Sequence, residues 1–239
     1  MADAVRIVNT NIAEVTGTLR ASGPVDGYLT LSDGRRRSYH LDGVLFYLAP
    51  TYFRFDLKKL GDRQLLFGSN EEHYWFYSKE EDEYYCGRHG VQEDLPPEMP
   101  IRPDRIHHAL GLTPIAEGEE IIGRTRLIQR VVDDYQQILL LTNDDAGNTL
   151  VEKEYWLDRY APRLVRRVVF RDADGVVEME SRLNNYRALE RNGLWLPHVM
   201  VAHWPKEQMF MRLRVGKWKI VDQVGPHGPQ FATPMECIR

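Results

Sequence analysis

The sequence predicts a mainly β protein: a large curled antiparallel sheet that forms an unclosed β-barrel, with two short helices as a lid. Short runs rich in aromatic and β-branched residues recur along the 239 residues, and most end at Gly, Asn, Asp or charged residues. Short turns between such runs join antiparallel neighbours. Two helical segments are too few to cover a flat sheet of about twelve strands, and a sheet that large tends to curl.

The N-terminal part is predicted to hold a helix followed by a hairpin. A helix is expected within residues 1–15, because apolar residues recur there at helical spacing, namely Val5, Val8, Ile12 and Val15. Extended runs at 25–31 and 38–48 flank the turn-forming residues 32–35. This pattern is typical of a β-hairpin.

Residues 50–87 read as a β-meander of four short strands. In the first strand Phe53, Phe55 and Leu57 share one face, and the polar residues between them share the other. In the third strand, 74–77, aromatic residues occupy both faces. Either something covers both faces of this sheet, or one face binds an apolar group.

The second half continues the pattern after a proline-rich loop. A short helix is expected over 103–110, with Pro103 at its first position and Gly111 just past its end. Strands are then expected near 124–132, 136–141, 150–157, 164–171, 176–186, 195–204, 208–215 and 217–222. Residues 223–239 are expected to form an irregular tail along the surface, so residues 1–239 make a single domain.

Composition and charge exclude some classes of partner. The formal net charge of −4 gives no electrostatic case for nucleic acid or an anionic membrane surface. Apolar runs all fall short of the roughly 20 residues that a membrane helix needs.

The N-terminus does not resemble a signal peptide, so the protein is either cytosolic or has lost a leader. Cys86 and Cys237 could pair in an oxidising compartment or be two unrelated buried thiols.

Motifs for catalysis are missing. The sequence has no phosphate-binding loop, nucleophile elbow or thiol zinc motif. His107 and His108 are neighbours that do not face each other on a helix, so we expect surface residues rather than a metal site. Acidic residues such as Asp133 and Asp144 fall in predicted turns. Our main expectation is a protein that is not an enzyme and that binds no cofactor or metal. A hydrolase that uses such loop carboxylates is kept as an alternative.

The sequence is also rich in large apolar side chains, to which none of these motifs gives a role. Tryptophan and methionine recur through the second half, as at Trp156, Met179 and Met200. These residues either fill an ordinary core or line a cavity for flexible acyl chains, which methionine and aromatic side chains suit.

Several short sequence motifs, and their order along the chain, resemble those of the LolA-like family of lipoprotein-sorting proteins. Members of that family are periplasmic carriers of acylated proteins and lipids. Residues 50–55 are similar to that family's Pro-x-x-Phe-x-Trp strand, and 74–77 to its Leu-Trp-Phe-Tyr hairpin. Further similar runs lie at 65–70, 155–158, 168–175 and 193–197. The resemblance covers roughly residues 4–222, and one departure is Ala49, where the carriers have an arginine that fastens the lid.

The resemblance implies an unclosed β-barrel with a helical lid over an apolar cavity, and no catalysis. We therefore expect the protein to bind lipid or the acyl chains of lipoproteins, in the periplasm or anchored to the cell envelope. An envelope protein is a further candidate partner. The residues expected to line the cavity are Phe53, Phe55, Leu66, Trp75, Tyr77, Trp156, Phe170, Met179 and Met200. The alternative is a protein-interaction module on the same barrel with a filled core.

Overall fold

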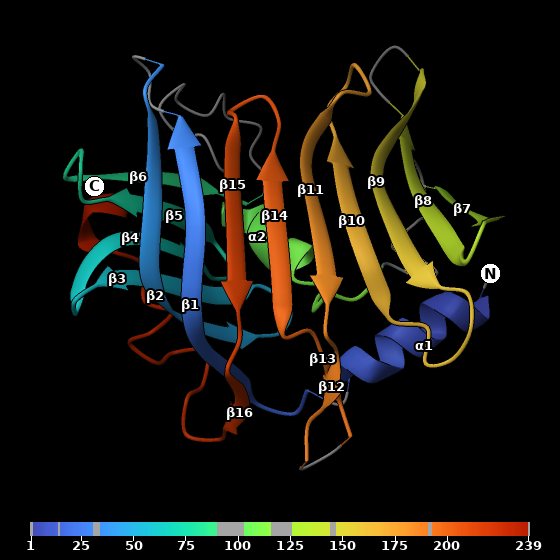
Figure 1. Cartoon of the computed structure of the whole chain (residues 1–239), viewed down its shortest axis with the longest axis horizontal. Helices are drawn as coiled ribbons and strands as arrows, with labels where there is room; N and C mark the ends of the chain where they lie inside the picture. The colour runs from blue at the N-terminus through green and yellow to red at the C-terminus, as the bar shows by residue number, and fades with distance from the viewer. Residues whose placement is uncertain are drawn as a thin grey trace.

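A computed structural model describes residues 2–13, 15–30, 34–89, 103–115, 126–143, 147–190 and 193–238. The predicted mainly β architecture is confirmed (Figure 1). The described helices are α1 (Ala2–Ala13), α2 (Pro103–Ala109) and a 3-10 turn, η2 (Met235–Cys237). The first strands are β1 (Thr18–Thr30), β2 (Arg36–Leu48), β3 (Tyr52–Lys59), β4 (Asp62–Ser69), β5 (His73–Ser78) and β6 (Glu83–Arg88).

The second half supplies the remaining strands. They are β7 (Arg126–Val132), β8 (Tyr135–Asn143), β9 (Thr149–Asp158), β10 (Val165–Arg171), β11 (Val177–Asn184), β12 (Arg187–Ala188), β13 (Trp195–Leu196), β14 (Val199–Trp204), β15 (Met209–Arg214) and β16 (Lys217–Val221). The single strand expected over 195–204 is two strands, β13 and β14. Pro197 stands between them, and a proline cannot donate a hydrogen bond to a ladder.

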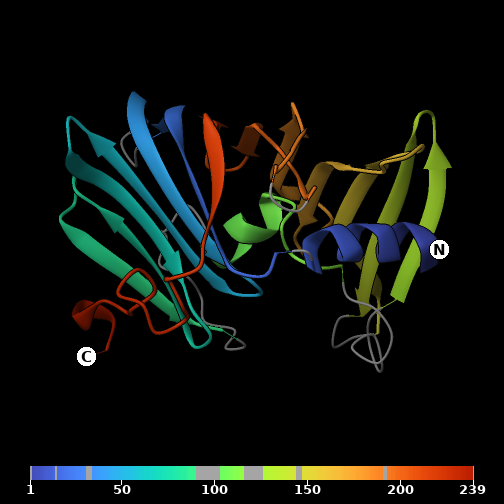
Figure 2. The same cartoon turned by 90° about the horizontal axis from the view of Figure 1, so that it is seen from below.

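One 14-stranded antiparallel sheet contains all of these strands except β12 and β13. Its order is β6-β5-β4-β3-β2-β1-β15-β14-β11-β10-β9-β8-β7, with β16 also paired to β1. The first strand of the chain therefore lies in the middle of the sheet, between strands from both halves. The end strands β6 and β7 are not paired to each other, so the barrel is unclosed (Figures 1 and 2).

The two faces of the curled sheet differ. We call the face that carries the helices the inner face; Figure 2 shows α2 within the curve of the sheet. Strand register places Phe53, Phe55 and Leu57 of β3 on the inner face, as the alternation predicts, with Phe67 of β4 and Phe76 of β5 beside them. These side chains belong to one continuous buried core that also contains side chains of both helices.

Helix α1 is held by its apolar stripe and by two asparagines. Val5, Val8 and Ile12 are buried, as predicted from their spacing. The amide of Asn9 both donates to and accepts from the backbone of Ile115, at 2.8 Å each. Asn11 makes the same kind of paired contact with the backbone of Trp195.

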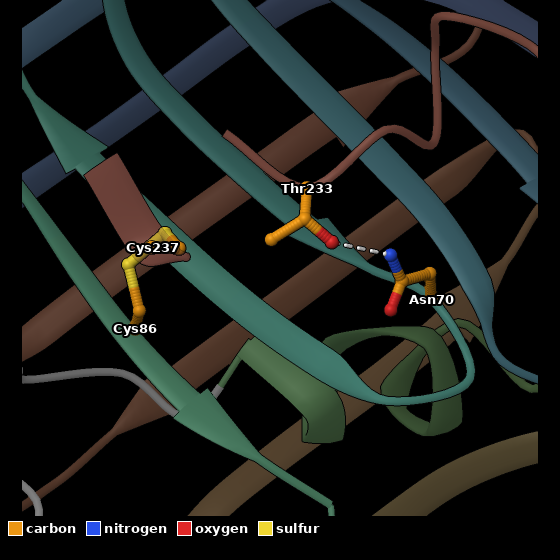
Figure 3. The surroundings of a disulfide bond; sticks show 4 residues. All are labelled: Asn70, Cys86, Thr233 and Cys237. Atoms are coloured by element: carbon orange, nitrogen blue, oxygen red, sulfur yellow. Dashed lines mark hydrogen bonds between the residues drawn. A yellow bond between two sulfur atoms is a disulfide. The ribbon is translucent and has the colours of Figure 1, made fainter. Parts of the chain in front are cut away.

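The C-terminal segment covers the outer face of β3–β6, as the predicted surface-hugging tail. Cys86 of β6 and Cys237 form a disulfide, and Asn70 donates to the hydroxyl of Thr233 at 2.8 Å (Figure 3). The ring of Phe231 is buried and packs edge-on against Tyr52, with centroids 5.5 Å apart. Both faces of this part of the sheet are therefore covered, which resolves the alternative raised by the aromatic run 74–77.

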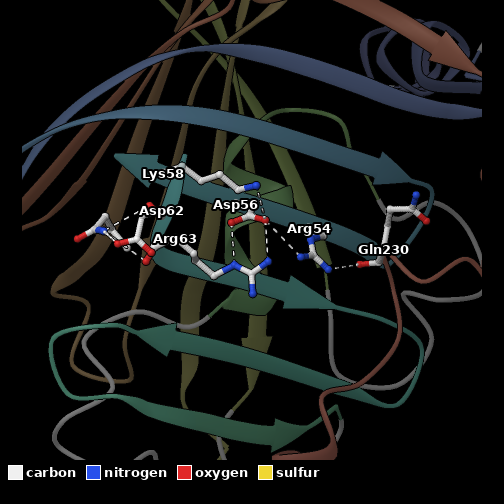
Figure 4. A network of polar contacts seen from close by, with 7 residues as sticks. Arg54, Asp56, Lys58, Asp62, Arg63 and Gln230 are labelled. Carbon is white, nitrogen blue, oxygen red and sulfur yellow. Dashed lines mark hydrogen bonds and ion pairs between the residues drawn. The ribbon is translucent and has the colours of Figure 1, made fainter. Parts of the chain in front are cut away.

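A charged cluster lies on the same outer face, beside the tail (Figure 4). The carboxylate of Asp56 accepts two hydrogen bonds from Arg63, each at 2.9 Å, and a third from Arg54 at 3.2 Å. Arg54 also donates to the backbone carbonyl of Gln230 in the tail, at 3.4 Å. Burial raises the pKa of Asp56, but the contacts with Arg63 and Arg54 outweigh it and hold the pKa below its usual value.

Candidate functional site

An apolar hollow opens on the inner face of the first half of the sheet. Its volume is about 40 Å³, and strands β1–β5 and β15 supply its walls. The lining is almost free of polar atoms and consists of Val25, Gly27, Tyr28, Leu29, Tyr39, Leu41, Leu57, Leu65, Phe67, Phe76, Met209, Phe210 and Met211.

A row of aromatic rings runs along the inner face and passes through this hollow. Across β3, β4, β5 and β6 the rings of Phe55, Phe67, Phe76 and Tyr85 follow one another, with centroid separations of 6.4, 4.9 and 6.1 Å. The register brings them together, because Phe55 pairs with Phe67, and Phe76 pairs with both Phe67 and Tyr85. Phe67 and Phe76, the two middle rings of this row, line the hollow and give it an apolar wall.

Helix α2 lies next to the hollow and fills the middle of the inner face. Ile106, Ala109 and Leu110 pack onto the strands and leave a space of only about 10 Å³ beneath them. Met211 lines both this space and the hollow, so the two are adjacent. Cavities that hold small molecules usually measure about 300–1,000 Å³. The interior around α2 is therefore packed, with too little space for a small molecule.

Two hydrogen bonds from sheet side chains hold α2 and the residues that follow it. Ser181 of β11 donates to the carbonyl of Ala109 at 2.7 Å, and Tyr47 of β2 donates to that of Leu112 at 3.0 Å. Beside Gly111, the hydroxyl of Tyr186 in the loop after β11 donates to the carbonyl of Val165 at 2.6 Å. Ser181 and Tyr47 come from opposite halves of the sheet, so the segment 103–115 bridges the two halves.

The prediction that His107 and His108 lie on the surface is wrong. His107 is buried, with its ring 6.4 Å from the rings of both Tyr47 and Phe53. Burial lowers the pKa of His108 well below its usual value, and the nearby Lys153, His107 and Arg105 lower it further. The periodicity of the helix gave no signal for this, because α2 packs into a concave sheet that surrounds it on more than one side.

Charged groups lie on the inner face at the far side of α2. The ammonium of Lys153 of β9 is 4.8 Å from the centroid of the Phe170 ring, and its side chain is largely buried. Arg105 of α2 forms an ion pair with Glu178 of β11. This side of the interior is therefore more polar than the hollow.

The structure brings five of the nine predicted lining residues to the inner face. Phe53 and Phe55 lie under α2 from one half of the sheet, and Phe170, Met179 and Met200 from the other half. All five are buried in the core. Of these, Phe55 and Met200 line the small space beneath α2.

The other four predicted residues lie on the outer face. Leu66 and Trp75 are buried there, and Trp75 is the register partner of Cys86, whose disulfide anchors the tail. Tyr77 stacks on Tyr84 with centroids 4.8 Å apart. Trp156 faces a polar groove of the second half. Because these side chains point away from the helices, they cannot line the same space as Phe53 and Phe55.

Residues that the prediction missed make up most of the hollow. Phe67, Phe76 and Met211 alternate with residues of the opposite face, so the period of two in β4, β5 and β15 was the signal that could have identified them. Of the two acids named for the alternative hydrolase, Asp133 lies in the β7–β8 turn, and Asp144 lies outside the described residues. Within the described ranges no three metal-binding side chains gather at one point.

Comparison with known proteins identifies the fold. No family model and no curated protein matches the sequence. Among solved structures, a DUF1329 family protein from Desulfovibrio piger superposes with a TM-score of 0.56 at 10% identity, over 94% of each chain. A putative outer membrane lipoprotein-sorting protein domain from Vibrio parahaemolyticus gives 0.55 at 12% identity, again over 94% of each chain. A LolA superfamily protein from Nitrosomonas europaea gives 0.53 at 10% identity, over 91% of this chain and 94% of that chain.

This chain has the LolA-like fold. The resemblance drawn from the sequence motifs is thus confirmed for the architecture, over nearly the whole chain. The described helices of this chain are all too short or too polar to cross a membrane.

Proposed function

We propose that this LolA-like protein is a non-enzymatic carrier that binds lipid, or the acyl chains of lipoproteins, on the inner face of its sheet. The observation that carries the proposal is the apolar hollow beside α2, which Phe67 and Phe76 of the aromatic row line. A hydrocarbon chain laid along this surface gains about 0.8 kcal/mol for each methylene removed from water. The surface is almost free of polar atoms that could select a headgroup, so chain length and shape would decide what binds.

The mechanism requires α2 to act as a lid. In the packed state Ile106, Ala109 and Leu110 occupy the space that the ligand would enter. A chain that displaces them exchanges one apolar contact for another, so the net cost of opening lies mainly in the polar contacts of α2: the hydrogen bonds from Ser181 and Tyr47 and the Arg105–Glu178 ion pair. In the absence of a ligand, the apolar side chains of α2 therefore occupy the space that the ligand would fill.

The compartment follows from the same proposal. A disulfide between Cys86 and Cys237 is typical of an oxidising environment such as the bacterial periplasm. The name of the Vibrio parahaemolyticus neighbour, an outer membrane lipoprotein-sorting protein, points in the same direction. We place the protein in the cell envelope, either in the periplasm or held there by a lipid anchor, with an envelope protein as partner.

One observation favours a second function. The spaces of about 10 and 40 Å³ are far smaller than a ligand site, as expected for a barrel with a filled core that serves as a protein-interaction module. The two functions differ in one respect: only the carrier has a lid that opens.

Titration with a fluorescent fatty acid separates the two. The carrier is expected to show saturable binding that unlabelled fatty acid competes away, and native mass spectrometry after gentle extraction is expected to find co-purified lipid. Met211→Trp fills the junction of the two spaces and is expected to abolish binding. Val176→Trp, at a half-exposed turn position, is the matched control and is expected to bind normally.

A second variant tests the lid itself. Ser181→Ala removes the hydrogen bond to Ala109 and is expected to speed fatty-acid binding without changing the apolar surface. Absence of saturable binding at micromolar concentrations in the wild-type protein and in Ser181→Ala would instead support the interaction module.

A further inference from the structure

A polar groove lies on the outer face of β8–β11, on the opposite side of the sheet from the hollow. Its volume is about 540 Å³, within the range of about 300–1,000 Å³ typical of small-molecule sites. We call it the arginine groove, and its lining consists of Tyr135, Trp156, Asp158, Arg166, Arg167, Arg182 and Asn184.

Strand register concentrates arginine in this groove. Trp156, Arg167 and Arg182 stand directly opposite one another on β9, β10 and β11. The pairing is irregular between Val165 and Arg167, so Arg166 joins Arg167 on the outer face while Val165 turns inward to the core. Like charges placed opposite one another destabilise a sheet, so three adjacent arginines are an arrangement that folding alone does not favour.

The carboxylates of the groove do not balance its cations. Glu180 is shared: Arg167 donates to it at 2.8 Å and Arg182 at 2.6 Å. Asp158 accepts two hydrogen bonds from the Nε of Arg166, at 2.8 and 2.9 Å. Three guanidinium groups thus face two carboxylates, and the buried Nε of Arg167 makes no hydrogen bond within the described chain.

Aromatic rings form a flat wall beside the cations. The indole of Trp156 is fixed by its N–H, which donates to Glu154 at 3.1 Å, and by an edge-on contact with Tyr135, with centroids 6.0 Å apart. The guanidinium of Arg167 lies 5.4 Å from the centre of the indole. A ligand in the groove would therefore meet a hydrogen-bonding cationic floor and an aromatic side.

We propose that the arginine groove binds a phosphate group, either of a lipid headgroup or of a free phosphorylated compound. The planar fork of arginine matches phosphate oxygens, and the excess of one positive charge favours an anion although the whole chain carries −4. The aromatic wall gives room for the body that carries the phosphate. Because the groove and the hollow lie on opposite faces, this proposal stands or falls independently of the carrier function.

The test follows the arginine Nε–H signals by NMR while inorganic phosphate, and then glucose 6-phosphate, is added at low ionic strength. The Arg167 signal is expected to shift saturably. Arg182→Gln, at a side chain that is 64% exposed, is expected to leave the melting temperature unchanged and weaken binding about tenfold or more. Arg212→Gln is the matched control, because Arg212 also lies over an aromatic ring, that of Phe210, on β15.

Vesicle sedimentation distinguishes the two sources of phosphate. Binding to phosphatidylglycerol vesicles but not phosphatidylcholine vesicles, lost in Arg182→Gln and competed by glucose 6-phosphate, assigns a lipid headgroup. Saturable binding of glucose 6-phosphate without sedimentation assigns a free phosphorylated compound. The proposal is overturned if the Arg167 signal does not saturate with either phosphate, or if Arg182→Gln and Arg212→Gln weaken binding equally.

Discussion

The disulfide between Cys86 and Cys237 should account for a large part of the stability of the folded chain. The two cysteines are 151 residues apart, so the bond closes a loop that includes most of the sheet. In the chain-entropy model, a loop of that length stabilises the folded state by roughly 5 kcal/mol, an upper value for Cys86→Ala/Cys237→Ala. In the double variant the tail keeps the polar contacts of Asn70 and Arg54 and the packing of Phe231.

Urea denaturation followed by circular dichroism gives the change in unfolding free energy. We expect the free energy of unfolding to fall by several kcal/mol. Tryptophan fluorescence should also change at a lower urea concentration than in the wild type, because the tail that covers Trp75 detaches. Met235→Ala is the matched control: it lies in the same turn as Cys237, its side chain is 73% exposed, and its loss should alter stability by less than about 0.5 kcal/mol. A double variant within about 1 kcal/mol of the wild type would refute the reasoning, because the tail would then be fixed by its other contacts.

Three further changes test the core, the charged cluster and the outer-face packing. Phe55→Ala removes a fully buried ring from beneath α2 and should cost about 3–5 kcal/mol in urea denaturation; an effect below about 1 kcal/mol would mean that the core is loosely packed. Asp56→Asn should make the free energy of unfolding depend less on pH on the acid side. Folding lowers the pKa of Asp56, so the stabilisation from its carboxylate is present above pH 3.8 and is lost as the pH falls through the lower folded pKa. Equal plots of unfolding free energy against pH for the variant and the wild type, from about pH 5 to pH 2, would contradict this. Gly68→Ala would place a methyl group into the indole ring of Trp75 and should destabilise the protein by about 1–3 kcal/mol with altered tryptophan fluorescence, whereas Gly225→Ala, where a Cβ meets nothing, should be neutral.

Local patterns predicted much of the fold. The alternation from Tyr52 to Leu57 predicted which side chains of β3 share the inner face, and Gly111 and Pro103 marked the ends of the short helix almost to the residue. The aromatic run at 74–77 indicated that either both faces are covered or one face binds an apolar group, and it could not say that the cover on one face is the chain's own tail. These features depend on neighbours in the sequence, where side-chain spacing carries the information.

Features set by distant parts of the chain could not be predicted in the same way. The candidate lining set mixed both faces, because Trp75 and Leu66 are as apolar as Phe67 and only the register assigns them to the outside. The irregular pairing beside Arg167 and the burial of His107 likewise depend on strands and helices that pack from elsewhere. A long-range disulfide is of the same kind, since two cysteines alone do not say whether they meet.

The central position of β1 has a consequence for how the protein is made. While the chain emerges, β1 can pair with β2 at once, but its other edge must wait for β15 and β16, which are synthesised last. Contacts of such high sequence separation slow folding, and an unpaired edge in the middle of a sheet is prone to pair with other chains in the meantime. A protein with this topology is expected to depend on protection during synthesis or export until its final strands arrive.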